Sequence, residues 1–226
     1  MLVTITGLLS AAQLAEFKLA LEGVEWVDGR ATAGYLSSRA KNNEQVPEGH
    51  PVARRLGKVI LEELDKNQRF ISAALPLRVL PPLFNRYREG QSYGAHIDGA
   101  MRPIAGTAFR VRTDLSATLF LSDPAEYDGG ELLIGEEGEQ RSVKLPAGDM
   151  VLYSGGTVHR IMPVTRGLRM AAFFWVQSMV REGSQRDILF EFDTALQQLA
   201  HTGADHDACL RLAGVYHNLL RQWGDS

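Results

Sequence analysis

Apolar residues at helical spacing mark the first part of the chain. Ser10 and Gln13 have the spacing of a capping box, and apolar positions then recur every three or four residues until Gly23. Pro51 opens a second such stretch, whose apolar stripe continues to Leu64. The pattern predicts two amphipathic helices, and the second is suited to cover a sheet.

From about residue 77 the pattern changes to short apolar or alternating runs separated by turn residues. The runs are "LRVLPPLFNRY", "SATLFLSD", "ELLIG", "RSVKL", "DMVLYS" and "MAAFFWVQS", with "DGGE", "GEEGE" and "PAGD" between them. Many short strands at this spacing are typical of a sandwich or barrel of mostly antiparallel strands. We therefore expect a β core over residues 77–178.

Helical periodicity returns beyond Ser178. Ser184 and Asp187 have the spacing of a capping pair, and two apolar stripes follow, the second ending at Trp223. About 45 residues rarely hold a stable core alone, so we expect these helices to pack on the rest of the protein. The whole pattern predicts an α+β fold with a mainly β core: an N-terminal helical region over 1–76, the core over 77–178, and a C-terminal helical appendage over 179–226.

The composition argues against several classes of protein and of binding site. Of the 226 residues, 45% are apolar and 23% charged, as in ordinary soluble proteins, and the net charge of −3 disfavours nonspecific binding to nucleic acid. Cys209 is the single cysteine, so an intrachain disulfide and a cysteine-rich zinc site are excluded. The N-terminus lacks a basic region followed by a long apolar run, and no stretch reaches the roughly 18 apolar residues that cross a bilayer. We expect a cytoplasmic protein without membrane or nucleic-acid partners.

Candidate metal ligands occur in "YGAHIDGAM". In an extended segment His96 and Asp98 point to the same side. His159, which follows a predicted strand and a glycine turn, supplies a third ligand, and two imidazoles with one carboxylate form the facial triad of non-haem Fe(II) oxygenases. Taken alone, an H-x-D tripeptide is common, and a single histidine is more often a surface or core residue than a ligand.

Arg169 strengthens this interpretation. It follows His159 by ten residues, and Pro163 and Gly167 mark a turn between them, which predicts neighbouring antiparallel strands. Arginine binds a carboxylate through two parallel hydrogen bonds, so Arg169 is a candidate to hold a carboxylate cosubstrate. Arg166, in "TRG", is better suited to an exposed salt bridge at a hairpin tip.

The chain resembles a known family in its order of motifs: H-x-D, then "YDGGEL", then "PAGDMVLYSGGTVHRIMPVTRGLRMAAFFW". This order resembles the prolyl-hydroxylase-like dioxygenases that use Fe(II) and 2-oxoglutarate, and more closely the bacterial PKHD-type hydroxylases. The resemblance spans nearly the whole chain, including "ILFEFDTAL" and "YHNLLRQW" near its end. It implies a double-stranded β-helix, or jelly roll, with His96, Asp98 and His159 as iron ligands and Arg169 as the clamp for 2-oxoglutarate.

The resemblance also implies the reaction. It implies O2 as oxidant, L-ascorbate as a candidate reductant, and hydroxylation of an unidentified small molecule or peptide with release of succinate and CO2. A link to iron uptake is implied by the family alone. Tyr87, Tyr93 and Thr118 are candidates to help hold the cosubstrate, although the two tyrosines could equally be half-buried aromatics.

Other features have structural interpretations or leave alternatives open. Gly129 and Gly130 are interpreted as permitting a bulge or a close backbone approach. Of Phe174 and Trp175, at least one is expected in the core, because successive strand residues face opposite sides. Two other functions remain open at this point: a cupin-like metal protein, and a non-catalytic barrel that senses iron or 2-oxoglutarate. The helical stripes leave the oligomeric state undetermined.

Overall fold

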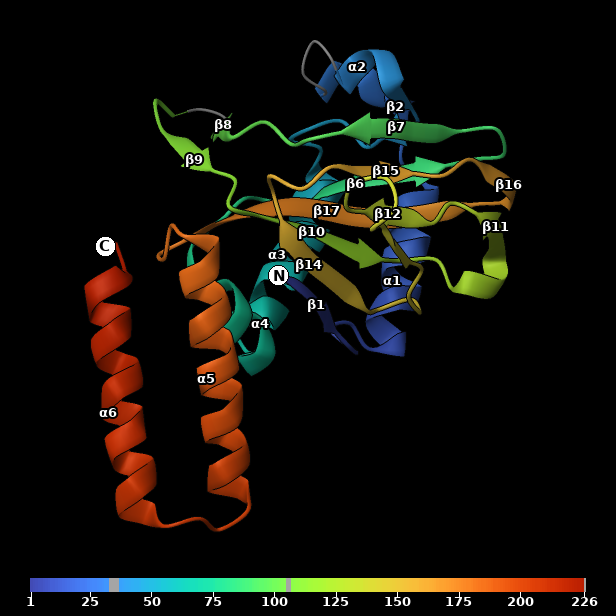
Figure 1. Ribbon diagram of the computed structural model, residues 1–226. Helices are drawn as coiled ribbons and strands as arrows, with labels where there is room; N and C mark the ends of the chain where they lie inside the picture. Colours follow the sequence, from blue (N-terminus) through green and yellow to red (C-terminus); the bar gives the residue numbers. More distant parts are fainter. Residues whose placement is uncertain (33–36, 105–106, 226) are drawn as a thin grey trace.

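The computed structural model describes residues 1–32, 37–104 and 107–225 (Figure 1). Its helices are α1 (Ala11–Glu22), α2 (Ser37–Ala40), α3 (Pro51–Leu64), α4 (Gln68–Ala74), α5 (Gly183–His201) and α6 (His206–Trp223), with short 3-10 turns η1 (Gly29–Thr32) and η2 (Pro124–Glu126). Its strands are β1 (Leu2–Ile5), β2 (Val27–Asp28), β3 (Lys41–Asn42), β4 (Glu44–Gln45), β5 (Pro76–Val79), β6 (Leu83–Tyr87), β7 (Ser92–His96), β8 (Met101–Pro103), β9 (Arg110–Arg112), β10 (Leu115–Phe120), β11 (Tyr127–Gly129), β12 (Leu132–Ile134), β13 (Arg141–Val143), β14 (Met150–Ser154), β15 (His159–Ile161), β16 (Val164–Gly167) and β17 (Arg169–Ser178).

Two antiparallel sheets form the centre of the fold. The larger has the order β1-β14-β10-β17-β6-β4-β2, with β5 beside β17, and the smaller has the order β13-β12-β15-β7-β3. Two-stranded ribbons, β11 with β16 and β8 with β9, complete the described strands. The mixed, sheet-rich architecture agrees with the expected α+β class. The strands β1 to β4 were missed by the sequence analysis, which expected only helices before residue 77.

A hydrophobic core fills the space between the two sheets. It joins side chains of β6, β10 and β14 in the larger sheet to side chains of β12, β13 and β15 in the smaller one. Phe120 and Val151 are fully buried on one side of this core, and Leu132 is 1% exposed on the other. The side chains that face this space, polar ones included, therefore lie away from bulk water.

A second core lies on the opposite face of the larger sheet, beneath the N-terminal helices. Phe17 and Leu21 of α1 and Ile60 and Leu64 of α3 pack there with Phe174 of β17. Both predicted helices are confirmed: Ser10 and Gln13 form the capping box of α1, and Pro51 is the first residue of α3. Trp175 belongs to a different cluster, as strand alternation predicts.

The C-terminal helices α5 and α6 form an antiparallel pair that projects from one end of the sheets, beside α4 (Figure 1). Leu189 and Tyr216 close a small core with Leu75 and Val180, so the pair is packed on the rest of the chain as expected. The expected capping pair of Ser184 and Asp187 is wrong. Helix α5 begins at Gly183, because the preceding residue is already extended, and no side chain caps its first turn. Within the described ranges, no helix is long and apolar enough to cross a membrane.

Candidate metal centre

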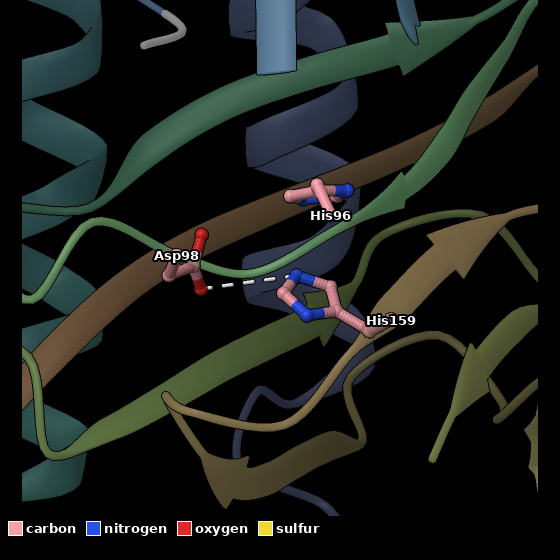
Figure 2. A group of neighbouring side chains, drawn as sticks. All are labelled: His96, Asp98 and His159. Carbon is pink, nitrogen blue, oxygen red and sulfur yellow. Dashed lines mark ion pairs between the residues drawn. The ribbon is translucent and has the colours of Figure 1, made fainter. Parts of the chain in front are cut away.

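The two adjacent strands β7 and β15 bring the three candidate ligands together. His96 is the last residue of β7, Asp98 follows two positions later, and His159 is the first residue of β15, directly opposite His96 in the register. Figure 2 shows the three side chains gathered together, with the Asp98 carboxylate facing the His159 ring and His96 above them. One ligand atom from each lies within 4.8 Å of the others, and His159 Nε2 is 3.7 Å from Asp98 Oδ2.

Hydrogen bonds orient all three side chains. Nδ1 of His96 lies 2.8 Å from the Gly94 carbonyl oxygen, and Nδ1 of His159 lies 2.9 Å from that of Thr157. A carbonyl oxygen only accepts, so each Nδ1 carries a proton, and in a neutral ring Nε2 is then the atom with the lone pair. Oδ2 of Asp98 accepts a hydrogen bond of 2.6 Å from Ser116 Oγ. These bonds are the kind that hold metal ligands in place.

The charges of the site favour the neutral imidazole at His96. Burial and the neighbouring His159 lower the pKa of His96 to about 4. A neutral imidazole is the form that binds a metal, so little proton release accompanies binding at neutral pH. Two imidazole nitrogens and one carboxylate oxygen are a donor set that fits Fe(II).

Aromatic side chains enclose the two histidines. The Tyr93 ring stacks on His96 with centroids 3.6 Å apart and planes 15° apart, and the Tyr153 ring meets His159 edge-on at 5.1 Å. Burial, with the negative charge of Asp98, raises the pKa of Tyr153 well above its usual value, while the charge of Arg169 opposes this. Tyr153 therefore lies within electrostatic reach of both the triad and Arg169.

Arg169 is buried in the same interior space. It opens β17 directly opposite Tyr87 of β6, is 1% exposed, and its guanidinium carbon lies 5.3 Å from the ring centroids of Tyr87 and Phe120. Among described residues no salt bridge reaches it, and its Nε and Nη2 have no hydrogen-bond partner. Burying a cation without an anion is costly, so this side chain is arranged to receive one.

Backbone geometry makes room for the arginine. Gly130 has a φ of +66°, and a Cβ at this position would lie 3.0 Å from Arg169 Cδ. The register of β11 with β16 shifts at Gly129, where a Cβ would lie 2.1 Å from the Pro163 carbonyl oxygen. The interpretation of the two glycines as a bulge and a close approach is confirmed, and Gly130 borders the space around Arg169.

One expectation about Arg169 is wrong. His159 and Arg169 do not lie on neighbouring strands, because β15 belongs to the smaller sheet and β17 to the larger. The intervening residues form β16, which pairs with β11, so the chain crosses between the sheets instead of folding back as a hairpin. Arg166 on β16 is exposed and forms a salt bridge of 2.6 Å with Asp128, as expected.

The larger sheet contributes two hydroxyl side chains from β10. Thr118 is buried and lies against the Tyr153 hydroxyl, whose pKa it lowers through a hydrogen bond. Ser116, two positions earlier on the same face, bonds to Asp98. The sequence analysis missed Ser116 and Tyr153. Strand alternation from Thr118 would have pointed to Ser116, because residues i and i+2 share a face.

Comparisons with known proteins agree with this geometry. A family model described as the 2OG-Fe(II) oxygenase superfamily matches residues 82–177, and one for the PKHD-type hydroxylase C-terminal domain matches residues 184–225. A PKHD-type hydroxylase of Pseudomonas putida (strain W619) is 56% identical over 225 residues, and one of Bordetella pertussis is 54% identical over 225 residues. Both alignments cover 100% of each chain.

Solved structures share the fold at low sequence identity. A prolyl-4-hydroxylase of Pseudomonas putida matches with a TM-score of 0.51 and 19% identity, covering 78% of this chain and 92% of its own. HygX of Streptomyces hygroscopicus, with nickel, 2-oxoglutarate and hygromycin B bound, matches with a TM-score of 0.55 and 16% identity, covering 78% and 82%. From the full-length relatives and the two family models, the chain belongs to the PKHD-type hydroxylases, a family of 2OG-Fe(II) oxygenases.

Proposed function

We propose that His96, Asp98 and His159 hold the Fe(II) of this oxygenase and that Arg169 binds the distal carboxylate of 2-oxoglutarate. The observation that carries the proposal is the buried guanidinium of Arg169, two of whose nitrogens lack a partner in the described chain. Arginine pairs with a carboxylate through a two-pronged contact, which would satisfy both nitrogens at once. Iron bound by the triad supplies the oxidative chemistry: hydroxylation of a substrate by O2, coupled to conversion of 2-oxoglutarate to succinate and CO2.

The residues of this chain bind, orient and shield. The Nδ1–H bonds to Gly94 and Thr157 present both Nε2 atoms to the metal, and Ser116 fixes the Asp98 carboxylate. Tyr87, against the guanidinium, and Thr118, beside Tyr153, border the space assigned to 2-oxoglutarate. Tyr93 covers His96 and limits the approach of water.

The two facing antiparallel sheets support a finer description of the fold as a double-stranded β-helix, or jelly roll. In this description residues 77–178 are the dioxygenase core, residues 1–76 cover its larger sheet and extend both sheets, and residues 179–226 are a helical appendage. We also propose a cytoplasmic location and L-ascorbate as a candidate reductant.

Succinate release without prime substrate tests the proposed function. The protein is incubated with Fe(II), 2-oxoglutarate and O2, and succinate is measured by mass spectrometry. We expect slow O2-dependent succinate formation that Asp98→Ala abolishes, whereas Asp128→Ala, at an exposed carboxylate in a surface salt bridge, retains it. Equal succinate formation by Asp98→Ala and the unaltered protein would refute the assignment. Tight binding of iron and 2-oxoglutarate without any turnover would favour a sensing role.

A further inference from the structure

A cavity of about 440 Å³ is lined in part by β8, the strand that follows Asp98 along the chain. It lies between α3, the loop that joins β5 to β6, and β8, and its walls are mainly apolar. The apolar residues include Leu61, Leu80, Leu83, Ile104 and Trp175. This volume is within the range of small-molecule binding sites, roughly 300–1,000 Å³.

Trp175 is the residue of the cavity that lies nearest in strand register to the metal centre. It lies opposite Ser116 in the register of β17 with β10, so the two side chains share a face of the larger sheet. Ser116 in turn donates its hydrogen bond to Asp98. Phe173, on the same face as Trp175, packs against it edge-on with centroids 5.5 Å apart. Trp175 thus lines the cavity and lies across the strand pair from the residue that bonds to Asp98.

The polar residues of the cavity are mostly positive. Arg102 lies with its guanidinium carbon 4.0 Å from the Trp175 ring centroid, and it forms no salt bridge with any residue of the described ranges. Arg54 and Lys58 line the cavity from α3, and Glu48 is the acidic residue of the lining. An anion bound here would meet a net positive environment.

Lys41 is a second cation, which lies within electrostatic reach of both Arg102 and Asp98. Its side chain is 6% exposed, its Nζ donates a hydrogen bond of 2.6 Å to Gln45 Oε1, and it lies 5.4 Å from the Tyr93 ring centroid. Burial and the charge of Arg102 lower the pKa of Lys41 to about 8. Asp98 attracts both cations, but its charge is assigned to the metal.

We propose that the prime substrate of this oxygenase is a small organic anion. Its apolar or aromatic body occupies the cavity against Trp175, and its negative group lies between Arg102 and Lys41. The inference rests on the proposed function, because it takes the triad as the reacting centre. It disfavours a cationic substrate such as a lysyl side chain, which would be repelled by both residues.

Three small molecules that share a phenyl ring and differ in charge test the proposal. The full chain is loaded with Mn(II) and saturating 2-oxoglutarate, which occupies Arg169, and is titrated calorimetrically with phenylacetate, phenylacetamide and phenethylamine. We expect phenylacetate to bind at least about tenfold more tightly than the amide or the amine. A single hydrogen bond to a charged group is strong enough to give a difference of this size. Arg102→Gln and Lys41→Gln should each remove most of this preference, whereas Arg211→Gln, at an exposed position on α6, should keep it.

Binding of 2-oxoglutarate is measured in every variant, both as a check of folding and to separate the two proposals. Equal affinities for the three probes, a preference for the amine, undetectable binding of phenylacetate, or a preference that survives both substitutions would overturn the anionic substrate. If the unaltered protein failed to bind 2-oxoglutarate in the presence of Mn(II), the proposed function itself would fail. Absence of the charge preference from the unaltered protein, with intact 2-oxoglutarate binding, would remove this inference alone.

Discussion

Arg169→Met removes the charge of the buried guanidinium while keeping an unbranched side chain in its place. Removing one partner of a buried charge pair costs roughly 3–5 kcal/mol, and each 1.4 kcal/mol is a factor of ten in affinity. The Kd for 2-oxoglutarate should therefore rise by at least about 100-fold. Metal binding should be retained, because the triad comes from β7, the segment after it and β15, and not from β17.

Thermal unfolding with Mn(II) converts this loss into a measurable shift. At a 2-oxoglutarate concentration about 100 times the wild-type Kd, the ligand stabilises the wild type by about 2.7 kcal/mol. For a variant whose Kd has risen about 100-fold, the same concentration equals its Kd and contributes only about 0.4 kcal/mol. At roughly 2–4 °C per kcal/mol for a chain of this size, the Tm shift is about 5–11 °C for the wild type and about 1 °C for Arg169→Met.

Arg166→Met is the matched control for this experiment. It changes the same residue type three positions earlier, where the side chain is exposed and paired with Asp128. Its 2-oxoglutarate-dependent shift should equal that of the wild type. If Arg169→Met kept the full shift, the orphaned guanidinium would not be the carboxylate clamp, and the reasoning from its burial would be refuted.

Three further variants test other parts of the structure. Ser116→Ala removes the hydrogen bond to Asp98 and should weaken Mn(II) binding by about tenfold in competition with a chelator, the lower end for such supporting groups; an unchanged affinity would show that Ser116 does not position this ligand. Gly130→Ala places a Cβ against Arg169 Cδ at a φ of +66°, so it should raise the KM for 2-oxoglutarate, measured as succinate release, and an unaltered KM would contradict the tight fit. Leu189→Ala opens a cavity in the core beneath α5 and should lower the free energy of unfolding by roughly 2–5 kcal/mol in urea titrations; Leu199→Ala, on the same helix but 39% exposed, is its control, and equal losses would show that the helix pair is not packed through Leu189.

The sequence predicted the local features well, because each depends on a short stretch. The capping box at Ser10, the proline that opens α3 and the alternation that separates Phe174 from Trp175 are set by neighbouring residues. The short strands β2, β3 and β4 could not be predicted in this way. Each has two residues, and its place is fixed by pairing with strands far along the chain.

The candidate site was predicted as a set of residues but not as an arrangement. His96 and Asp98 are close in sequence, whereas the position of Arg169 depends on which sheet β17 joins. The spacing from His159 to Arg169 suggested a hairpin, but pairing of β16 with β11 carries Arg169 to the opposite sheet. Neither Ser116 nor Tyr153 is part of a recognisable sequence motif. Strand alternation from Thr118 points to the face on which Ser116 lies, but the place of Tyr153 follows only from the register of β10 with β14, which sets it opposite Ser116.

The central claim is that the triad holds Fe(II) with positions open for 2-oxoglutarate. Absorption spectroscopy of the protein with Fe(II) and 2-oxoglutarate under anaerobic conditions tests it most directly, because chelation by the 2-keto acid produces a weak metal-to-ligand charge-transfer band. We expect this band in the unaltered protein and in His206→Gln, at an exposed histidine of α6, and its loss in His159→Gln. Absence of the band from the unaltered protein, or an undiminished band in His159→Gln, would contradict the account.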